Sequence, residues 1–294
     1  MSVGRLSYAL VTPARDEAAN LRRLAACLAA QSVPPAEWVI VDDGSRDSTI
    51  EVARALEREH AWVQVVSSAG AALDTASGRR TGRDVIAFKT GLAALEREPD
   101  VVLKLDADVS FDDDFFDRLL REFEDDPKLG ISGAVCHELH RNEWRPYRVA
   151  RGHVRGATRA YRWRCLVDVS PLEEQIGWDA VDEVRAKLRG WQTRTVEGLA
   201  FRHHRRLGTR DGRRTQWRMQ GALAHYLGYR LLYLLARTLW RVREDRAALL
   251  MVPGFLAAAW RREPRCRDED VRAYLRDEQS LRRLPLRLRE VLGR

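Results

Sequence analysis

The sequence has few cysteines and almost no lysine. Its four cysteines, Cys27, Cys136, Cys165 and Cys266, are widely spaced and form no C-x-x-C pair. This spacing suggests neither a zinc site nor a disulfide framework, and it suits a reducing compartment best. Lysine accounts for only 4 of the 51 basic residues, so arginine carries nearly all the positive charge of the chain.

Long hydrophobic runs are also missing. The most apolar segment, residues 221–242, is interrupted by His225, Arg230 and Arg237, and so falls short of the roughly 20 uninterrupted apolar residues of a membrane span. A helix lying on a membrane surface and a helix buried against the rest of the protein both remain compatible with this segment. The first residues, MSVGRLSYALVTPARDE, lack the apolar core of a signal peptide, which predicts a cytoplasmic protein.

Two glycine-rich motifs that bind phosphate groups are absent. The chain has no G-x-G-x-x-G after its first apolar run and no G-x-x-x-x-G-K-[ST] anywhere. The backbone amides of a dinucleotide-type turn or a P-loop are therefore not available to hold phosphate. A phosphate-bearing ligand would need another source of positive charge, and a divalent metal held by carboxylates would provide it.

What the chain does contain is a regular alternation of apolar runs and helical patterns. Short runs typical of strands alternate with segments whose apolar residues repeat at helical spacing. This order predicts an α/β fold with a mostly parallel, Rossmann-like sheet and helices on both faces. The expected strands are 6–11, 38–41, 63–67, 101–105, 129–135 and 191–196, and the expected helices are 17–30, 49–59, 83–97, 113–124 and one after Gly177.

Two acidic pairs follow predicted strands. Asp42 and Asp43 end the second run, and Asp106 and Asp108 follow the fourth. Ligands of such sheets bind beyond the carboxyl ends of the strands, so we expect both pairs at one edge. Because alternate residues of an extended segment point the same way, Asp106 and Asp108 can face one ligand, one toward a metal and the other toward a hydroxyl or a metal-bound water. One such pair is often only a turn or a helix cap, but two favour function.

Three segments resemble one enzyme family. TPARDE at 12–17, VIVDDGSRDST at 39–49 and LDADVSF at 105–111 are similar, in this order, to the nucleotide-sugar half of the inverting family 2 glycosyltransferases, which have the GT-A fold. The resemblance covers about residues 6–140. It implies that the first-strand segment and the Asp-Asp pair hold the nucleoside, whereas the D-x-D motif carries a divalent metal, Mg²⁺ or Mn²⁺, and the donor diphosphate.

Carried over residue by residue, the resemblance implies a nucleotide-sugar site and a metal site. The nucleotide-sugar residues would be Thr12, Pro13, Ala14, Arg15, Glu17, Asp42, Asp43, Arg83 and Asp106, and the metal ligands Asp108, Asp106 and His203. We expect Asp108 to be the carboxylate that touches the metal. Between the motifs, GRDVIAFKTGL replaces the family's usual asparagine-bearing helix, so Arg83 and Lys89 are only candidates for the phosphate side.

The second half of the chain carries a candidate general base. GWDAVDEVRAKLRGW, residues 177–191, resembles a variant of the family's E-D-x-x-L-x-x-R-L-x-x-x-G element, with Trp178 in place of the usual glutamate. This resemblance places Asp179 on the catalytic aspartate. Asp182 lies one turn further on the same helix face and is able to share the role. The plain alternative is that Asp179 only caps the helix.

The segment LAFRHHRRLG, residues 199–208, offers a histidine pair. It resembles the segment in which a histidine of the family binds the metal and basic residues close over the diphosphate. We favour His203 over His204 as that ligand. Arg205 and Arg206 are candidates for stabilising the departing phosphate charge.

Acceptor-binding residues are expected in RGHVRGATRAYRW, residues 151–163, which precedes the base helix at the distance typical of related enzymes. Arginine and aromatic side chains suit sugar rings and lipid phosphates. The candidates are His153, Arg155, Trp163 and, from the base helix, Trp178. An ordinary basic surface loop would give the same pattern.

The predicted organisation is a catalytic domain followed by a basic extension. Residues 1–215 form the GT-A domain, with 1–140 as its nucleotide-sugar half and 141–215 as its acceptor half, and residues 216–294 form a helical extension. From residue 201 onward the chain has 23 arginines against 10 acidic residues. Such a surface suits anionic lipid or nucleic acid, although a solvated arginine-rich helix looks the same.

The expected function is metal-dependent, inverting transfer of a sugar from a nucleotide-sugar, with a UDP-sugar as the favoured donor, to a hydroxyl of a glycan or lipid-linked acceptor. Cell-surface polysaccharide or glycolipid synthesis would be its setting, peripheral on the inner face of the membrane. A second interpretation is transfer to polyprenyl phosphate. A third, a non-catalytic basic protein that binds nucleic acid or membrane, leaves both acidic pairs unexplained, and we expect no nucleic-acid partner.

Overall fold

The computed structural model describes residues 5–68, 82–140, 142–147, 153–205, 212–243 and 245–280 of the chain. Contacts divide the chain into two compact units, Met1–Arg205 and Arg206–Arg294, and each unit is described by itself. The boundary that the sequence predicts, after residue 215, lies near this division.

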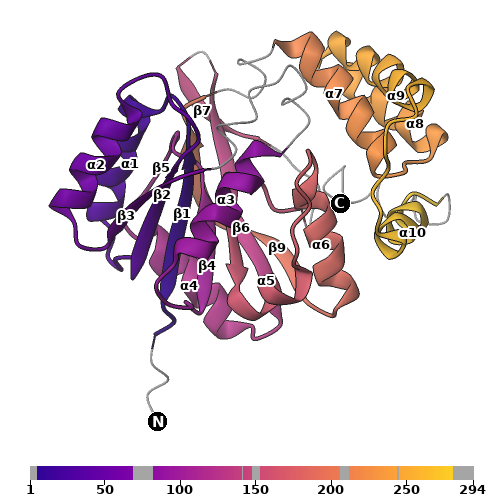
Figure 1. The fold of residues 1–294 in the computed structure, drawn as a ribbon. Helices are drawn as coiled ribbons and strands as arrows, with labels where there is room; N and C mark the ends of the chain where they lie inside the picture. The colour runs from indigo at the N-terminus through magenta and orange to yellow at the C-terminus, as the bar shows by residue number, and fades with distance from the viewer. Residues whose placement is uncertain are drawn as a thin grey trace. The chain divides into compact units, whose positions relative to one another are not determined.

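The first unit alternates strands and helices (Figure 1). Its strands are β1 (Tyr8–Ala14), β2 (Glu37–Asp42), β3 (Val63–Ser67), β4 (Val101–Leu105), β5 (Val109–Phe111), β6 (Leu129–His140), β7 (Glu143–Pro146), β8 (Thr158–Arg162) and β9 (Gln192–His203). Its helices are α1 (Ala18–Ala29), α2 (Thr49–Glu59), α3 (Arg83–Ala94), α4 (Phe115–Asp125), α5 (Trp163–Val169) and α6 (Trp178–Leu188). The predicted β-α-β order of the first half is confirmed.

The described strands of this unit form a mixed sheet. The strand order is β3-β2-β1-β4-β8-β6-β9-β5, and β7 pairs with β6 at the side. The four strands from β3 to β4 are parallel, as predicted. In the other half, β8 is antiparallel to both β4 and β6, whereas β9 is parallel to β6. The expectation of a mostly parallel sheet therefore holds for the first half only.

Two strands of the second half are longer than their apolar runs predict. Those runs end at residues 135 and 196, but β6 continues to His140 and β9 to His203. The strands continue because their backbone groups remain paired with each other, and Cys136, Leu199 and Phe201 in these extensions still belong to the core. In this extension Glu138 lies opposite His203, so residues far apart in the sequence become neighbours.

The sheet separates two hydrophobic cores. In β1, Leu10 belongs to the core that includes residues of α1, α2 and α4, whereas Val11 belongs to the core that includes residues of α3, α5 and α6. Successive side chains of a strand point to opposite faces, so one strand serves both cores. Helices thus cover both faces, as predicted.

The carboxyl ends of β1, β2 and β4 lie side by side. Ala14 at the end of β1 pairs with Asp42 at the end of β2. On its other side β1 pairs with β4, where Val11 lies opposite Lys104. The segments that follow these strands, including both acidic pairs, therefore start from one edge of the sheet.

The second unit is helical in its described part. It contains α7 (Arg213–Tyr226), α8 (Leu231–Val242), a 3₁₀ helix (Arg246–Leu250), α9 (Met251–Trp260) and α10 (Glu269–Glu278). The apolar segment 221–242 is not the single helix that its pattern suggests, because it breaks at Gly228, which has a φ of +71°. This left-handed conformation suits glycine and ends α7. Among the described residues, no helix combines the length and hydrophobicity needed to cross a membrane.

Gly91 lets α3 lie directly against the parallel strands. A Cβ atom at this position would overlap with Val11 Cγ1 and come within 2.9 Å of Val41 Cγ2. We expect Gly91→Ala to lower the free energy of unfolding by about 1–3 kcal/mol, because overpacking moves the helix away from the sheet. Urea unfolding followed by circular dichroism measures the change. Ala93→Ser, on the exposed side of the same helix, is the control, and equal stability of the two variants would contradict the prediction.

Candidate active site

The two aspartates that follow β2, Asp42 and Asp43, make different contacts: Asp42 closes a turn and Asp43 forms an ion pair. The carboxylate of Asp42 accepts hydrogen bonds from the backbone amides of Gly44 and Ser45, both at 3.3 Å, and so closes the turn. Asp43 is buried, and its Oδ2 atom accepts from Arg83 Nε at 2.9 Å. Its Oδ1 atom is also buried but has no hydrogen-bond partner among the described residues. Asp43 therefore offers an acceptor oxygen at this edge.

The segment after β1 is only partly available to a ligand. Thr12 is fully buried, and its hydroxyl accepts a hydrogen bond from Trp38 Nε1 at 2.9 Å, so this side chain belongs to the core. Pro13 and Arg15 are half-buried, whereas Ala14 is buried. The resemblance to the family places Thr12 in the nucleotide site, and in this structure only its backbone is suited to such a contact.

Glu17 connects this segment to the end of β9. Its buried carboxylate accepts from Asn20 Nδ2 at 2.6 Å and forms an ion pair with Arg205, with Nη2 at 2.6 Å from Oε1. The Nε atom of the same Arg205 lies 3.6 Å from Asp108 Oδ2. Arg205 thus joins two of the predicted site residues, while Arg206 lies outside the described residues.

The D-x-D motif meets His203 as the sequence predicts. Asp108 is buried, and its Oδ1 atom lies 3.1 Å from His203 Nε2. The side chain of Asp106 keeps 32% of its surface exposed and accepts from Lys104 Nζ at 2.6 Å. One oxygen or nitrogen atom from each of Asp106, Asp108 and His203 lies within 4.8 Å of the other two. Two carboxylates and an imidazole at this spacing suit a divalent cation such as Mg²⁺ or Mn²⁺.

His204, the second histidine of the pair, lies outside the cluster of Asp106, Asp108 and His203. His204 is exposed, its Nε2 atom lies 2.8 Å from Ser110 Oγ, and its ring meets Trp144 edge to face at 5.3 Å. His203 rather than His204 is therefore the histidine that the structure brings to the D-x-D motif.

The charges of this cluster are strongly coupled. Burial lowers the pKa of His203, but the hydrogen bond to Asp108 and the negative charges of Asp108 and Asp106 outweigh it and raise the pKa to about 10. For Asp108, burial raises the pKa, but the contact with His203 and the charge of Arg205 hold it below its usual range. Without a metal, the pair is thus an imidazolium next to a carboxylate. A cation that bound there would displace the proton of His203.

Lys104 connects the D-x-D motif to the base helix. Its side chain is 3% exposed, and Nζ lies 3.6 Å from Asp84 Oδ2 in addition to its contact with Asp106. The ring of Trp178, at the start of α6, lies 5.9 Å from the ammonium. Burial lowers the pKa of Lys104, but Asp106, Asp84 and Asp179 outweigh it and raise the pKa above its ordinary value. The negative charge of the candidate base Asp179 therefore acts on the same ammonium group as that of Asp106.

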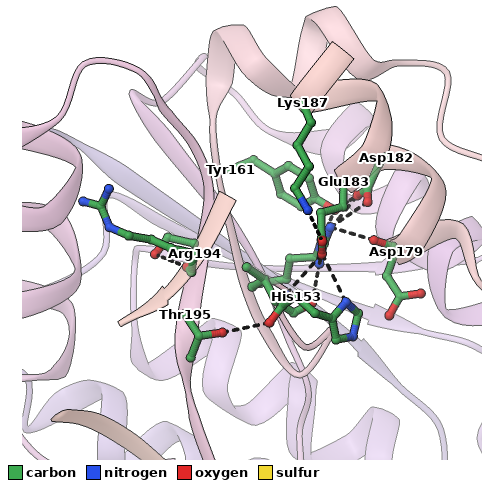
Figure 2. A network of polar contacts seen from close by, with 11 residues as sticks. His153, Tyr161, Asp179, Asp182, Glu183, Lys187, Arg194 and Thr195 are labelled. Carbon is green, nitrogen blue, oxygen red and sulfur yellow. Dashed lines mark hydrogen bonds and ion pairs between the residues drawn. The ribbon is translucent and has the colours of Figure 1, made fainter. Parts of the chain in front are cut away.

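Helix α6, which carries the candidate base Asp179 and is called the base helix, contacts a network of buried charges (Figure 2). Arg159 on β8 is fully buried, and it donates to Asp182 Oδ1 at 2.6 Å and to the backbone carbonyl of Asp179 at 2.8 Å. Asp182, 1% exposed, also accepts from the hydroxyl of Tyr161. Asp182 is therefore enclosed by protein. Figure 2 shows the carboxylate of Asp179, which is half-buried, pointing away from this network.

The carboxyl groups of Asp182 and Glu183 both form ion pairs with the guanidinium of Arg159. Burial raises the pKa of Asp182 to about 7, although the charge of Arg159 opposes this. Burial also raises the pKa of Glu183, but the hydrogen bond to His153 and the charges of His153 and Lys187 outweigh it and lower the pKa to about 2. In return, Glu183 raises the pKa of His153 against the effect of burial.

The predicted acceptor residues do not all reach this edge. His153 Nδ1 lies 3.1 Å from Glu183 Oε2, which places the ring beside the base helix. Arg155 lies over the ring of Tyr147 at 4.7 Å. Trp178 is 4% exposed, and its Nε1 atom donates to Asp84 at 3.2 Å, so it supports the site from within the core.

The sequence pattern suggested Trp163 as an acceptor-binding residue, but the structure places it away from the D-x-D motif. Its backbone amide donates to the carbonyl of Asp100, which precedes β4. The D-x-D motif follows β4, so Trp163 lies at the opposite end of a strand that spans about 16 Å at roughly 3.3 Å per residue. β8 runs antiparallel to β4, so it carries Thr158 toward the site and Arg162 and Trp163 away from it. Lys89, a candidate for the phosphate side, is paired with Glu174.

Three residues of the site were missed by sequence reasoning: Lys104, Arg159 and Glu183. Lys104 had a signal, since it is a charged residue inside the apolar run VVLKL just before the D-x-D motif. A charge in a buried strand requires a partner, and the next acidic residue supplies it. No sequence pattern points to Arg159 and Glu183, because their pairing depends on how β8 and α6 pack together in the folded chain.

Comparisons with known proteins identify the family of the chain. The family model described as Glycosyl transferase family 2 matches residues 9–169, which is more than half of the 294 residues. The chain belongs to glycosyl transferase family 2. It is thus a glycosyltransferase. No curated protein matches its sequence.

Solved structures of glycosyltransferases share the fold of this family 2 chain. The mannosyltransferase PcManGT from Pyrobaculum calidifontis, in complex with GDP-Man and Mn²⁺, is 14% identical with a TM-score of 0.56, over 88% of this chain and 76% of that one. TarS 1–349 of S. aureus, in complex with UDP-GlcNAc, is 15% identical with a TM-score of 0.54, over 74% and 66%. GalNAc-T7 with UDP, GalNAc and Mn²⁺ is 13% identical with a TM-score of 0.56, over 70% of this chain and 45% of that one. These likenesses show the GT-A fold.

The network beneath the base helix predicts a pH-dependent loss of stability. Arg159→Met leaves Asp182 and Glu183 buried without their shared guanidinium, so we expect the free energy of unfolding at pH 7 to fall by about 3–5 kcal/mol. The charge of Arg159 lowers the pKa of Asp182, which is about 7 in the wild type, so this pKa is higher in the variant and the loss should grow as the pH rises from 7 to 9. Urea unfolding at both pH values measures it.

Arg194→Met is the matched control for this variant. Arg194 also pairs with two carboxylates, those of Glu122 and Asp126, but its side chain is 35% exposed. An exposed pair of this kind contributes about 0–1 kcal/mol. Equal losses in the Arg159 and Arg194 variants, or a loss that does not change with pH, would contradict the assigned role of the network.

Proposed function

We propose that this glycosyltransferase is metal-dependent and inverting, and that it moves a sugar from a nucleoside-diphosphate donor, UDP-linked by preference, to a hydroxyl of a glycan or lipid-linked acceptor. Synthesis of cell-surface polysaccharide or glycolipid is the setting that we propose. One observation carries the proposal: Asp106, Asp108 and His203 converge beside Lys104, whose charge environment includes Asp179 on the base helix. A donor-binding cluster and a candidate base thus share one edge of the sheet.

On the donor side, Asp43 and Arg83 suit the nucleoside and phosphate groups. The buried Oδ1 of Asp43 needs a donor, and the N–H of a nucleobase or a ribose hydroxyl would supply one. Arg83 and Arg205 lie close to two carboxylates of the site, Asp43 and Asp108, so they carry positive charge to the place where a diphosphate would lie. Both are able to stabilise negative charge on a departing nucleotide.

The donor set of the D-x-D cluster fits Mg²⁺ or Mn²⁺. Asp106, Asp108 and His203 would hold the ion, in agreement with the Mn²⁺ in the structures of PcManGT and GalNAc-T7. When bound, such an ion would neutralise the donor diphosphate and so favour its departure. Lys104 donates to Asp106 and so fixes the orientation of its carboxylate.

On the acceptor side, we propose Asp179 as the general base. Its carboxylate would take the proton of the acceptor hydroxyl as the oxygen attacks the anomeric carbon from the face opposite the diphosphate, which inverts that carbon. Arg159 positions Asp179 through its backbone carbonyl. Asp182 was considered for the same role, but its enclosure by Arg159 and Tyr161 favours a structural role.

Donor turnover tests this proposal. Purified protein with Mn²⁺ and a panel of UDP- and GDP-sugars should release the nucleoside diphosphate, and Asp108→Asn should abolish the response to Mn²⁺. Asp179→Asn should lower kcat by about 10²–10⁴-fold with little change in the KM for the donor, because only proton transfer is lost. Asp182→Asn is the matched control, which should lose stability instead. Wild-type rates in the Asp179 variant would contradict its role as base.

The second unit suggests contact with an anionic membrane surface. One side of α8 exposes Leu231, Leu232, Leu235 and Leu239, of which Leu232 is 73% and Leu239 69% exposed. The helix and its ends also carry Arg230, Arg237, Arg241 and Arg243. An apolar row flanked by arginines is typical of helices that lie in the headgroup region of a bilayer. A lipid-linked acceptor, including polyprenyl phosphate, would reside there.

Vesicle co-sedimentation tests this surface. The double variant Leu232→Glu/Leu239→Glu should weaken binding to vesicles that contain anionic lipid by at least about tenfold, because each leucine buried in the bilayer contributes roughly 1.5–3 kcal/mol. Leu188→Glu, an equally simple change at an exposed leucine of the first unit, is the control. Identical binding of both variants would contradict the proposal. Radiolabelled product that partitions into organic solvent would identify a lipid acceptor.

A further inference from the structure

His203 has a second set of neighbours, on β6. Cys136 and Glu138 are two residues apart on this strand and so point to the same face, and Glu138 lies opposite His203 in the register of β6 and β9. One ligand atom from each of Cys136, Glu138 and His203 lies within 4.8 Å of the other two. All three residues are buried. The imidazole of His203 is therefore shared by two clusters, one with Asp106 and Asp108 and one with Cys136 and Glu138.

The second cluster contains polar atoms without partners. His203 Nδ1 and Glu138 Oε1 are buried, and neither has a hydrogen-bond partner among the described residues. The nearest cations to Glu138 are too distant for a hydrogen bond: Arg155 Nη1 lies 3.7 Å from Oε1, and His140 Nε2 lies 3.9 Å from Oε2. A buried polar atom left unpaired costs about 1–3 kcal/mol. In the described part of the chain, Glu138 Oε1 has only the distant Arg155, and the imidazole of His203 interacts with the thiol of Cys136, so a cation bound between these side chains would give each of them a stronger partner.

The chemistry of the cluster points to a different cation from that of the D-x-D motif. A thiolate, a carboxylate and an imidazole are the ligands typical of Zn²⁺, with a fourth position left for water. The two carboxylates of Asp106 and Asp108 instead suit the harder Mg²⁺ and Mn²⁺. The wide spacing of the cysteines gave no sign of zinc, because the three ligands come from two strands that pair only in the folded chain.

We propose that Cys136, Glu138 and His203 form a site for Zn²⁺ that competes with the D-x-D cluster for His203. A neutral imidazole has one free lone pair, so His203 ligates one cation at a time. Zinc binding at this site releases two protons to solvent, one from the thiol of Cys136, which becomes a thiolate, and one from the imidazolium of His203, which becomes neutral. The binding of zinc stands on the cluster alone, whereas the resulting inhibition of sugar transfer rests on the proposed function.

Asp106 is the most exposed residue of the cluster that it forms with Asp108 and His203. The side chain of Asp106 is 32% exposed, whereas those of Asp108 and His203 are 9% and 10% exposed. Arg155 remains close enough to balance the charge of Glu138 when the site is empty.

Cobalt absorption and calorimetry on the full chain test the site. Co²⁺ should give a thiolate charge-transfer band in the near ultraviolet, and Zn²⁺ should displace it with a stoichiometry of one per chain. Cys136→Ser should abolish the band and weaken Zn²⁺ binding by at least about tenfold, since even the loss of a residue behind the ligands has such an effect. Glu138→Gln, which keeps the shape of the side chain, should weaken Zn²⁺ binding similarly and serves if the serine variant fails to fold.

Two controls separate this site from its neighbours. Cys27→Ser removes a half-buried cysteine elsewhere in the first unit and should keep both the band and the zinc affinity. Asp108→Asn should keep Zn²⁺ binding while losing Mn²⁺ binding. A band that survives in Cys136→Ser, or disappears in Cys27→Ser, would overturn the proposal, as would unchanged zinc affinity in both cluster variants.

The inhibition is tested apart from the binding. If the enzyme turns over donor with Mn²⁺, Zn²⁺ should inhibit it, and the concentration for half inhibition should rise by at least about tenfold in Cys136→Ser. Donor turnover without zinc binding would overturn the zinc site and leave the proposed function intact. Zinc binding in a chain that turns over no donor would overturn the proposed function and leave the zinc site intact.

Discussion

The buried ammonium group of Lys104 is the charge on which both sides of the candidate active site depend. An isolated ammonium in the interior costs several kcal/mol, so its position in β4 requires carboxylates around it. Asp106 comes from the segment after the same strand and Asp84 from α3, and Trp178 of α6 lies against the same group. Three elements are thus held in place by one cation. The geometry proposed for donor and base follows from this single electrostatic requirement.

The parts of the site that follow from local patterns could be predicted from the sequence. Asp42, Asp43, Asp106 and Asp108 each come directly after an apolar run, and parallel strands bring their carboxyl ends to one edge whatever the details of packing. The motif strings of the family then gave the order of the first half, and the family match over residues 9–169 agrees with it. His203 was also found, because its segment resembles a known element of the family.

The remaining parts depend on contacts between distant segments. Whether Asp182 is exposed or enclosed is decided by Arg159, which reaches it from β8, and no spacing within α6 reveals this. The direction of β8 likewise decides that Trp163 lies away from the site. The cluster of Cys136 and Glu138 with His203 arises only from the register of β6 against β9. Sequence periodicity gives the faces of strands, but it does not give their neighbours or their order in a sheet.

The separation of two cores by the sheet has a consequence for how this enzyme can change. Residues of α1, α2 and α4 pack on one face, and residues of α3, α5 and α6 pack on the other. A substitution in one layer changes the packing of its own cluster first, because each face of the sheet has a separate hydrophobic cluster. The side chains around the proposed base on α6 can therefore change while the layer of α1 and α2 keeps its own packing.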